Sequence, residues 1–400
     1  MNRMDYGRSV VTVRVLEKRL LTKNRLERMI EAGSPDDVLK QLGETEYSHN
    51  MADIKDSRSY EKILRRETER VFSLVREMSN DSEIVDILSI KYDYHNLKVL
   101  LKSKLSGKDF TDLLMDAGTV KASRLKQKFE IQNYEDLPEE FIEAINEVEK
   151  DFAENNDPQK IDLIVDKYYY KHLSKIASKI DVEIMRDYVS GLIDFQNIIT
   201  LLRVKKQNRD LKFLEGVIHE GGNIPKDKIV VSLNDTPEMI ANKFRKEKIG
   251  TYLTAGIEAF ENTGRLSELE KISDNYLMAL NRESKYVVFG PEPLFTYLVA
   301  KEREINKKSV YRKVINIGLP VAIENMIYAL MNFVDMFMVG KEIVALGLGT
   351  AAVAGLGFAN QMFMIFMTSL FGMNSGGGIL AAQYFGNKDY KNLKKCLGIT

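Results

Sequence analysis

Histidine is the side chain best suited to bind a metal or to move protons near neutral pH, and this chain contains four histidines. They are His49, His95, His172 and His219. A zinc site needs histidine, cysteine or carboxylate ligands at short, regular spacings. The four histidines instead lie dozens of residues apart, with no cysteine or carboxylate partner at ligand spacing. We therefore expect surface or partly buried histidines, and we predict no metal site.

The sequence also contains no convincing phosphate-binding loop. Such a loop follows the pattern G-x-x-x-x-G-K-[ST], and the stretch SGKD at Ser106 lacks both the upstream glycine and the hydroxyl. The stretch GLGTAA at Gly347 superficially matches a dinucleotide fingerprint, which also requires an acid about twenty positions later to hold a ribose. No charged residue occurs from 343 to 387. We therefore predict no catalytic residue, no cofactor and no enzyme activity.

Two carboxylates, Glu324 and Asp335, stand in a strongly apolar segment. Residues 319–339 are enough to cross about 30 Å of hydrocarbon as a helix, and a second apolar stretch runs from about 350 to 373. Acids inside a membrane usually mark the path of an ion or substrate. At about 100° per residue, the polar residues of the first stretch fall within an arc of roughly 100°. This face either lines a cavity for cation or proton coupling or packs on partner helices, and the pattern favours neither.

Charge is divided unevenly along the chain, although the formal total is zero. Residues 306–400 hold nine Lys and Arg against four Asp and Glu, whereas residues 1–305 hold 49 against 54. Neither part is basic enough to suggest the clustered face that binds nucleic acid, so we predict no nucleic-acid partner. Because Cys396 is the only cysteine, no internal disulfide can form and a reducing compartment is expected.

The flanks of the two apolar stretches indicate how the chain meets a membrane. Four basic residues precede the first stretch and four follow the second. Because Lys and Arg gather on the cytosolic side, we expect both ends of this hairpin there. The N-terminus has no apolar run of the length that a signal peptide needs. We therefore predict a body at the cytoplasmic face of the cell membrane, with a C-terminal tail that inserts through residues 319–373.

The elements that carry these residues read as helices almost throughout the first three hundred residues. Several helix starts show a capping side chain followed by proline, a pair that suits the free N–H groups of the first turn. Convincing alternating strands are nearly absent, so the sequence predicts an all-α body. The clearest starts are Ser34 with Pro35, Asp157 with Pro158 and Thr236 with Pro237, and Gly43 marks a helix end.

Three leucine-rich segments resemble one another at nearly constant spacing. They read NLKVLLKSK (96–104), NIITLLRVK (197–205) and PLFTYLVAK (293–301), and the first two extend backwards together as DYHN and DFQN. Chance similarity between leucine-rich helices is the alternative, but the regular spacing favours three pseudo-repeated helical bundle domains. The motif positions are Asn96, Leu97, Leu101, Asn197, Ile198, Leu202, Pro293, Leu294 and Leu298.

Residues 1 to about 304 resemble the C subunit of the prokaryotic V-type (A/V-type) rotary ATPases, the relative of the eukaryotic d subunit. The matching stretches are YGRSVVTVRVLEKRLLT, DYHNLKVLLKSKL, IDLIVDKYYYKHL, DFQNIITLLR and FGPEPLFTYLVAKEREI. The resemblance implies a funnel of three similar helical domains that caps the membrane rotor ring and seats the central shaft. Such a subunit transmits torque between ATP chemistry elsewhere and the movement of protons or sodium in the membrane.

From about residue 306 the sequence departs from this family, whose members continue with a segment that completes the third unit. The stretch INIGLPVAIENMIYALMNFVDMFMVG, followed by AAVAGLGFANQMFMIFMTSLFGMNSGGGILAAQYFGNKD, resembles the first two helices of multidrug and toxin extrusion (MATE) transporters. This resemblance implies that Asp335 occupies the place of an acid implicated in cation or proton coupling in part of that family. Such transporters have further helices, so the chain would stop where a third begins.

These features together predict four parts. Residues 1–305 form the body that resembles the V-type ATPase subunit, 306–313 a basic junction, 314–387 a transmembrane hairpin and 388–400 the start of a third helix. We expect a non-catalytic central-stalk subunit that links the shaft to the rotor ring and carries an anomalous transporter-like tail. The alternative is a truncated MATE-type efflux transporter fragment that carries a cytosolic helical domain.

Overall fold

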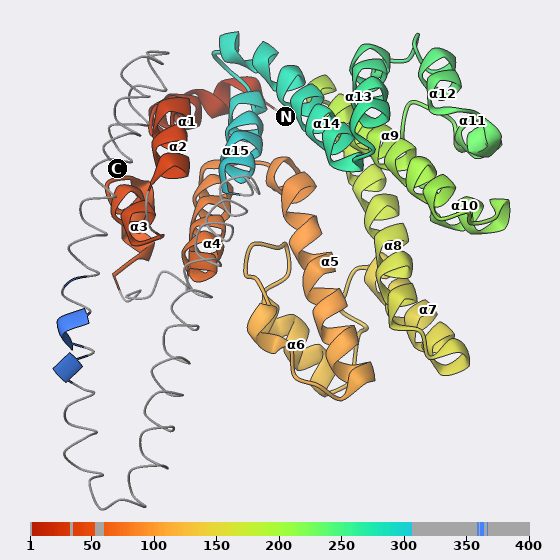
Figure 1. Cartoon of the computed structure of the whole chain (residues 1–400), viewed down its shortest axis with the longest axis horizontal. Coiled ribbons are helices and arrows are strands. Elements are labelled where there is room, and N and C mark those ends of the chain that lie inside the picture. The colour runs from red at the N-terminus through yellow and green to blue at the C-terminus, as the bar shows by residue number, and fades with distance from the viewer. Residues whose placement is uncertain are drawn as a thin grey trace, which may run out of the picture. The chain divides into compact units, whose positions relative to one another are not determined.

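The computed structural model describes residues 2–32, 35–52 and 60–305, together with short pieces at 358–359, 361–363 and 366. In these ranges the regular elements are helices, and no strand occurs among the residues described. The all-α prediction is therefore confirmed for this part of the chain. Figure 1 shows the helices coloured in chain order.

The helices fall into two groups along the chain. The first group is η1 (Arg3–Tyr6), α1 (Gly7–Glu17), α2 (Lys23–Glu31), α3 (Pro35–Gly43), η2 (Glu46–Asn50), α4 (Tyr60–Met78), α5 (Glu83–Ser106), η4 (Thr111–Leu113), α6 (Ala122–Glu130) and α7 (Glu139–Asn155). The second group is α8 (Pro158–Lys179), α9 (Glu183–Lys206), α10 (Leu211–Val217), α11 (Lys226–Val230), η5 (Val231–Asn234), α12 (Pro237–Lys243), α13 (Gly250–Thr263), α14 (Leu266–Leu280), η6 (Asn281–Tyr286) and α15 (Glu292–Ile305).

Several helices begin where the sequence places a capping side chain. The Asp157 carboxylate accepts a hydrogen bond at 2.9 Å from a backbone N–H in the first turn of α8, which opens with Pro158. The Thr236 hydroxyl accepts one at 3.2 Å at the start of α12. α3 ends at Gly43 as predicted, whereas Ser34 lies outside the described residues. These caps satisfy N–H groups that have no partner within the helix.

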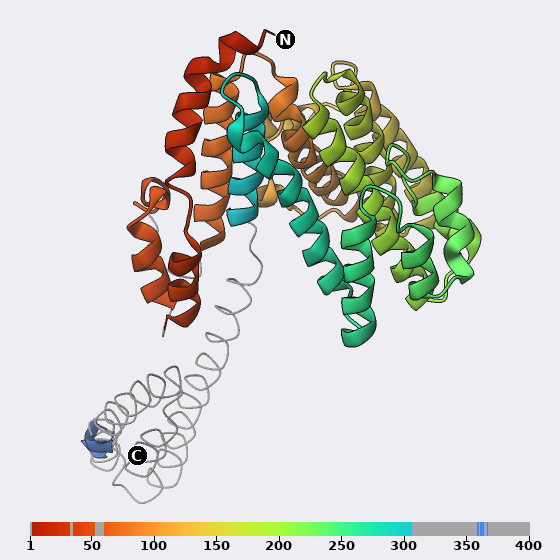
Figure 2. The same cartoon turned by 90° about the horizontal axis from the view of Figure 1, so that it is seen from above.

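Two helices of 24 residues, α5 and α9, form the centre of the body. α5 packs against α8, α8 packs against α7 and α9, and α9 packs against α14, which pairs with α13. Both central helices bury side chains around most of their circumference, as a helix surrounded by other helices does. One large apolar core therefore continues through these layers, which Figure 2 shows from a second direction.

The first and last helices of the body lie side by side in both views (Figures 1 and 2). α15 packs against α1, α4 and α5. A second, smaller apolar cluster forms at the end of α15, where Tyr47, Ile63 and Ile305 meet. Residues from opposite ends of the body therefore share a core, and this packing fixes the position of α15.

The chain divides into two compact units, Met1–Arg312 and Lys313–Thr400. The predicted spans at 319–373 belong to the second unit, and nearly all of them lie outside the described residues. Among the residues that the structure describes, no helix combines the length and the apolar character needed to cross a membrane. The hairpin and its flanking segments stay predictions, as does the funnel of three bundles.

Candidate functional site

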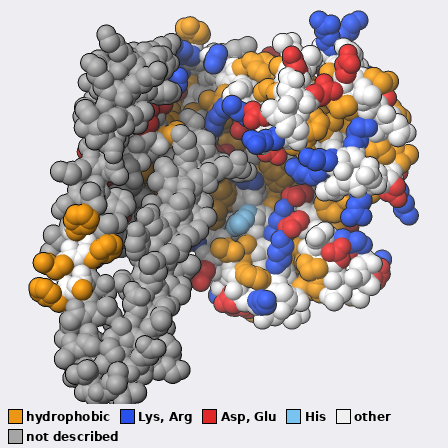
Figure 3. Space-filling model, viewed as in Figure 1, with side chains coloured by type: hydrophobic (Ala, Val, Ile, Leu, Met, Phe, Trp, Pro, Cys, Tyr) orange, Lys and Arg blue, Asp and Glu red, His pale blue; other side chains and the backbone are white. Residues whose placement is uncertain are grey.

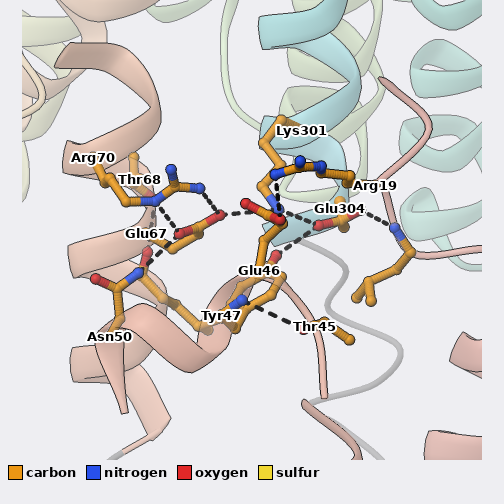
Figure 4. A network of polar contacts seen from close by, with 12 residues as sticks. Arg19, Thr45, Glu46, Tyr47, Asn50, Glu67, Thr68, Arg70, Lys301 and Glu304 are labelled. Carbon is orange, nitrogen blue, oxygen red and sulfur yellow. Dashed lines mark hydrogen bonds and ion pairs between the residues drawn. The ribbon is translucent and has the colours of Figure 1, made fainter. Parts of the chain in front are cut away.

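Buried charges gather where α15 meets the N-terminal helices (Figure 4). The Lys301 ammonium lies 3.1 Å from the Glu67 carboxylate of α4 and 2.6 Å from the Glu304 carboxylate one turn further along α15. Water hardly reaches this group, because Lys301 is only 2% exposed and Glu67 is 0% exposed. With Arg70 and Tyr47, these residues form a set that we call the α15 network.

Each carboxylate of the α15 network has further partners. Arg70 donates two hydrogen bonds to Glu67, at 2.8 and 2.9 Å, and this interaction raises the pKa of the Arg70 guanidinium. The Tyr47 hydroxyl donates to Glu304 at 2.9 Å, and the Tyr47 ring faces the Lys301 ammonium at 4.2 Å. Two cations therefore balance two anions, which is the condition under which buried charge is tolerated.

The α15 network joins segments that lie far apart in the sequence. Tyr47 belongs to η2, and the Glu304 carboxylate also accepts the backbone N–H of Leu21, in the link between α1 and α2, at 2.5 Å. A neighbouring contact adds α5, because the Tyr92 hydroxyl donates to Glu302 at 2.6 Å. The polar groups of the network are occupied by one another, so the arrangement positions helices instead of reacting with a solute.

Pairs of opposite charge also connect helices at the surface. Lys98 and Lys102 of α5 lie 2.7 and 2.8 Å from Asp166 and Asp162 of α8. On the face shown in Figure 3, positive and negative side chains are mixed over the body. Exposed pairs of this kind contribute little to stability, about 0–1 kcal/mol each. The buried α15 network is therefore the stronger candidate for a group that controls the shape of the body.

The structure places all nine positions of the predicted repeat in the interior. Each segment lies on a different helix: α5, α9 or α15. The buried positions are Asn96, Leu97, Leu101, Asn197, Ile198, Leu202, Pro293, Leu294 and Leu298.

Asn96 and Asn197 make the same pair of hydrogen bonds to a later loop. Asn96 donates to the carbonyl of Met115 at 2.7 Å and accepts the N–H of the same residue at 2.8 Å. Asn197 donates to the carbonyl of His219 at 2.8 Å and accepts its N–H at 2.9 Å. Each side-chain amide therefore satisfies both backbone groups of one residue in the chain that returns beside α5 or α9.

Asp93 and Asp194, one turn before these asparagines, also make matching contacts. The Asp93 carboxylate accepts the backbone N–H groups of residues 119 and 120, at 2.8 and 3.0 Å. The Asp194 carboxylate accepts those of residues 223 and 224, at 3.0 and 2.9 Å. Each aspartate, with the asparagine three residues later, forms what we call a DxxN clamp. The shared DYHN and DFQN were visible in the sequence, but the contacts of these side chains were not.

A glycine precedes the two N–H groups in each DxxN clamp. A Cβ atom on Gly118 would lie 2.1 Å from an Asp93 oxygen, and one on Gly222 would lie 2.2 Å from an Asp194 oxygen. Burial raises the pKa of both aspartates to about 6, although their hydrogen bonds act in the opposite direction. The loops therefore approach the carboxylates more closely than any other residue type would allow without a shift.

The third segment carries no such clamp within the described residues. Its first position is Pro293, and the position that corresponds to the aspartates is Gly290, so neither offers a side-chain acceptor. Lys301, at the ninth position, belongs to the α15 network instead. In the described body, α15 is therefore held by its contacts with the N-terminal helices.

The four histidines remain apart in the fold. His49 and His95 are exposed, and burial lowers the pKa of His172. His219 stacks on Tyr170 with ring centres 4.2 Å apart, and burial lowers its pKa to about 4. Within the described ranges, no group of three or more potential ligands is placed to hold a metal.

An open cleft of about 600 Å³ lies between α14, α15 and the link that joins α1 to α2. Leucine and methionine side chains line part of it, and Arg282 and Arg303 bring positive charge. The Arg303 guanidinium is fixed by the Asp274 carbonyl at 2.8 Å and the Asn275 side chain at 2.7 Å. No sequence pattern indicated this cleft, because its lining comes from elements far apart along the chain.

The predicted coupling acids, Glu324 and Asp335, lie outside the described residues. Their role in cation or proton coupling therefore stays a prediction.

Comparison with known families assigns the helical body to a class of protein. Residues 9–307 match the family model described as "ATP synthase (C/AC39) subunit". The chain therefore belongs to the ATP synthase (C/AC39) subunit family. A second family model, MatE, matches residues 320–400. The first match ends just after α15, and the resemblances expected from the sequence are confirmed for both parts.

Individual relatives narrow this class further. The C subunit of the V-type sodium ATPase of Enterococcus hirae is 28% identical over 301 residues, which cover 75% of this chain and 91% of the relative. The C subunit of the A-type ATP synthase of Methanocaldococcus jannaschii is 23% identical over 338 residues, covering 80% and 85%. Its counterpart in the Pyrococcus horikoshii A-type ATP synthase is 26% identical over 315 residues, covering 76% and 84%. The body is thus similar to the C subunits of V-type and A-type enzymes over most of their length.

Proposed function

We propose that the body of this chain is a non-catalytic subunit of a rotary V-type ATPase or ATP synthase that links the central shaft to the membrane rotor ring. The observation that carries the proposal is the family match over residues 9–307, which takes in nearly all of the described body. The relatives are named as C subunits of a sodium ATPase and of ATP synthases. In this function, ATP chemistry and the passage of protons or sodium take place in other subunits.

A linking subunit has to transmit torque without changing shape. The α15 network supports this role because it ties the last helix of the body to α4, η2 and the link between α1 and α2. Separating buried charges from their partners is costly in an environment of low polarity. The two DxxN clamps act in the same direction, because each holds a returning loop against a central helix.

We also propose that the body consists of three related helical units arranged as a funnel. The matching contacts of the two DxxN clamps support the relation between the first two units. The third unit, built around α15, would then be closed by the N-terminal helices. Superposition of the helices around α5, α9 and α15 in an experimental structure tests this, and unrelated helix directions around α5 and α9 would reject it.

The tail supports a separate proposal, that residues 319–373 insert in the cell membrane and hold the body at its cytoplasmic face. The MatE match over residues 320–400 carries it. By this resemblance, Asp335 and Glu324 would face a cavity and take part in cation or proton coupling. The same match favours the second candidate function, a transporter fragment that carries a cytosolic helical domain. The longer match makes the stalk subunit the primary proposal.

Complementation of a rotary ATPase that lacks its own C/AC39 subunit tests the linking role. Residues 1–305 should restore ATP-driven ion pumping and should hydrolyse no ATP by themselves. The full chain should fail to restore pumping, because the junction 306–313 spans at most about 28 Å when fully extended and would tether the body beside the ring. Binding of residues 1–305 without any recovery of pumping would refute the linking function.

A further inference from the structure

Exposed apolar side chains gather on a surface formed by both ends of the body. They come from η1 and α1 and from residues 286–289, which lead from η6 to α15. Tyr286 is 83% exposed and Val11 is 67% exposed. We call this set the α1 face, and its members are Met4, Val11, Val15, Tyr286, Val288 and Phe289.

The two rows of the α1 face adjoin one another. Val11 and Val15 are four residues apart, so they lie on one side of α1. Phe289 contacts the next strip of the same helix, because its ring lies 3.2 Å from the place that a Cβ atom on Gly7 would occupy. The exposed side of α1 and the segment leading into α15 therefore form one continuous surface.

Polar contacts fix the second row against α1. Arg14 donates hydrogen bonds to three backbone carbonyls within residues 284–287, at 2.9 to 3.3 Å. At the other end, Arg3 pairs with Glu292, the first residue of α15, at 2.7 Å. The exposed rings and methyl groups thus stand on a held backbone, which reduces the entropy that a partner would have to remove on binding.

The rim of the α1 face is predominantly basic. Arg8, Lys18 and Lys285 are exposed beside the apolar side chains. Of the carboxylates nearby, Glu292 is paired with an arginine, and Asp5 accepts a hydrogen bond from a neighbouring asparagine at 3.0 Å. A partner that complements this surface would be apolar at its centre and acidic at its edge.

We propose that the α1 face is the docking surface for the cytosolic edge of the membrane rotor ring. Tyrosine, phenylalanine, methionine and arginine, which form much of this face, are the residue types enriched in protein interfaces. An exposed apolar patch rimmed by polar groups is also the usual mark of such a site. The inference rests on the proposed linking function, because that function supplies the partner.

The shape and charge of the α1 face favour the ring over the shaft. A shaft has to be seated in a hollow, and none of the residues of the α1 face lines the cleft between α14, α15 and the α1–α2 link. A ring instead presents a broad edge at the level of the lipid headgroups. The cytoplasmic leaflet has a negative surface potential at that level, which suits the basic rim.

A single introduced tryptophan tests the location of the interface, since the chain contains no tryptophan of its own. Val288→Trp places the indole in the α1 face, and Met239→Trp is the matched control in α12, where the native side chain is 54% exposed. The full chain in mild detergent is mixed with a purified rotor ring of an A- or V-type ATPase. The indole emission should shift to shorter wavelength for Val288→Trp only. The absence of a shift there, or equal shifts at both positions, would overturn the proposal.

Charge substitution provides the binding measurement. Val11→Asp adds a carboxylate opposite the acidic edge of the partner, and we expect about tenfold weaker ring binding, equivalent to about 1.4 kcal/mol. Met239→Asp should bind the ring as the native chain does. Equal affinities for the two variants would contradict the proposal.

Two further mixtures separate the ring from other partners. Anionic phosphatidylserine vesicles without a ring, and isolated shaft subunits, should leave the emission of Val288→Trp unchanged. A full shift with vesicles would assign the α1 face to lipid, and a full shift with the shaft would assign it to the shaft, so either result rejects the ring. Normal pumping with a body that carries Val11→Asp would preserve the linking function and reject the α1 face as its docking surface.

Discussion

Replacement of Lys301 by methionine tests whether the α15 network holds the body together. Methionine has a similar length but no charge, so Lys301→Met removes both ion pairs and keeps much of the packing. The carboxylates of Glu67 and Glu304 then stay buried with an excess of negative charge. Their remaining donors are Arg70 for the first, and Tyr47 with a backbone N–H for the second.

The expected loss follows from the burial of the pair. Removing one partner of a buried ion pair destabilises a protein by about 3–5 kcal/mol, because a charge is left without compensation. Glu67 and Glu304 retain hydrogen bonds, which favours the lower end, about 3 kcal/mol. The whole free energy of unfolding of a domain is about 5–15 kcal/mol, so such a loss should be measured easily.

Urea unfolding of residues 1–305, followed by far-ultraviolet circular dichroism, provides the measurement. The matched control is Lys102→Met, since Lys102 is 38% exposed and pairs at 2.8 Å with Asp162, which is also at the surface. That change should cost about 0–1 kcal/mol. Adding Glu67→Gln to Lys301→Met should recover part of the loss, because it removes one of the two uncompensated charges. If Lys301→Met were no more harmful than Lys102→Met, the α15 network would not be what secures α15.

The remaining predictions concern the clamps and the tail. Because the folded pKa of Asp93 is raised from 3.8 to about 6, this carboxyl adds stability below about pH 4 that is lost as the pH rises to about 6. The native chain should lose stability over that range relative to Asp93→Asn, and parallel urea midpoints would refute this. Gly222→Ala should destabilise by about 1–3 kcal/mol, since its Cβ atom would meet Asp194, whereas Gly216→Ala has open space and should be nearly neutral in the same unfolding assay. Residues 1–305 should extract as soluble protein while the full chain requires detergent, and a full chain that stays monomeric in buffer would contradict the predicted spans.

Local signals in the sequence were sufficient for the helices. The starts of α8 and α12 could be predicted because a capping side chain and the N–H group that it accepts lie within three residues of each other. The buried sides of α5, α9 and α15 could be predicted as well, because leucine spacing reports which side of a helix avoids water. Glu324 and Asp335 could be singled out, but their surroundings lie outside the described residues.

Partners across the fold were beyond the reach of this reasoning. Nothing in the local sequence of Lys301 distinguishes it from Lys104 and Lys205 at the same motif position, yet only Lys301 lies between two buried carboxylates. The likeness of DYHN and DFQN indicated a relation between α5 and α9, but the loops that Asp93 and Asp194 hold come much later along the chain.

Short-range patterns of caps, apolar spacing and motif letters were therefore enough for the helical class, the position of the helices, the family of the body and the change of family beyond α15. The folded arrangement was needed to learn which charges are buried, which are paired, and which apolar side chains are left exposed. Burial and pairing depend on which helices pack together. That packing depends in turn on contacts between residues from opposite ends of the body, which no local pattern records.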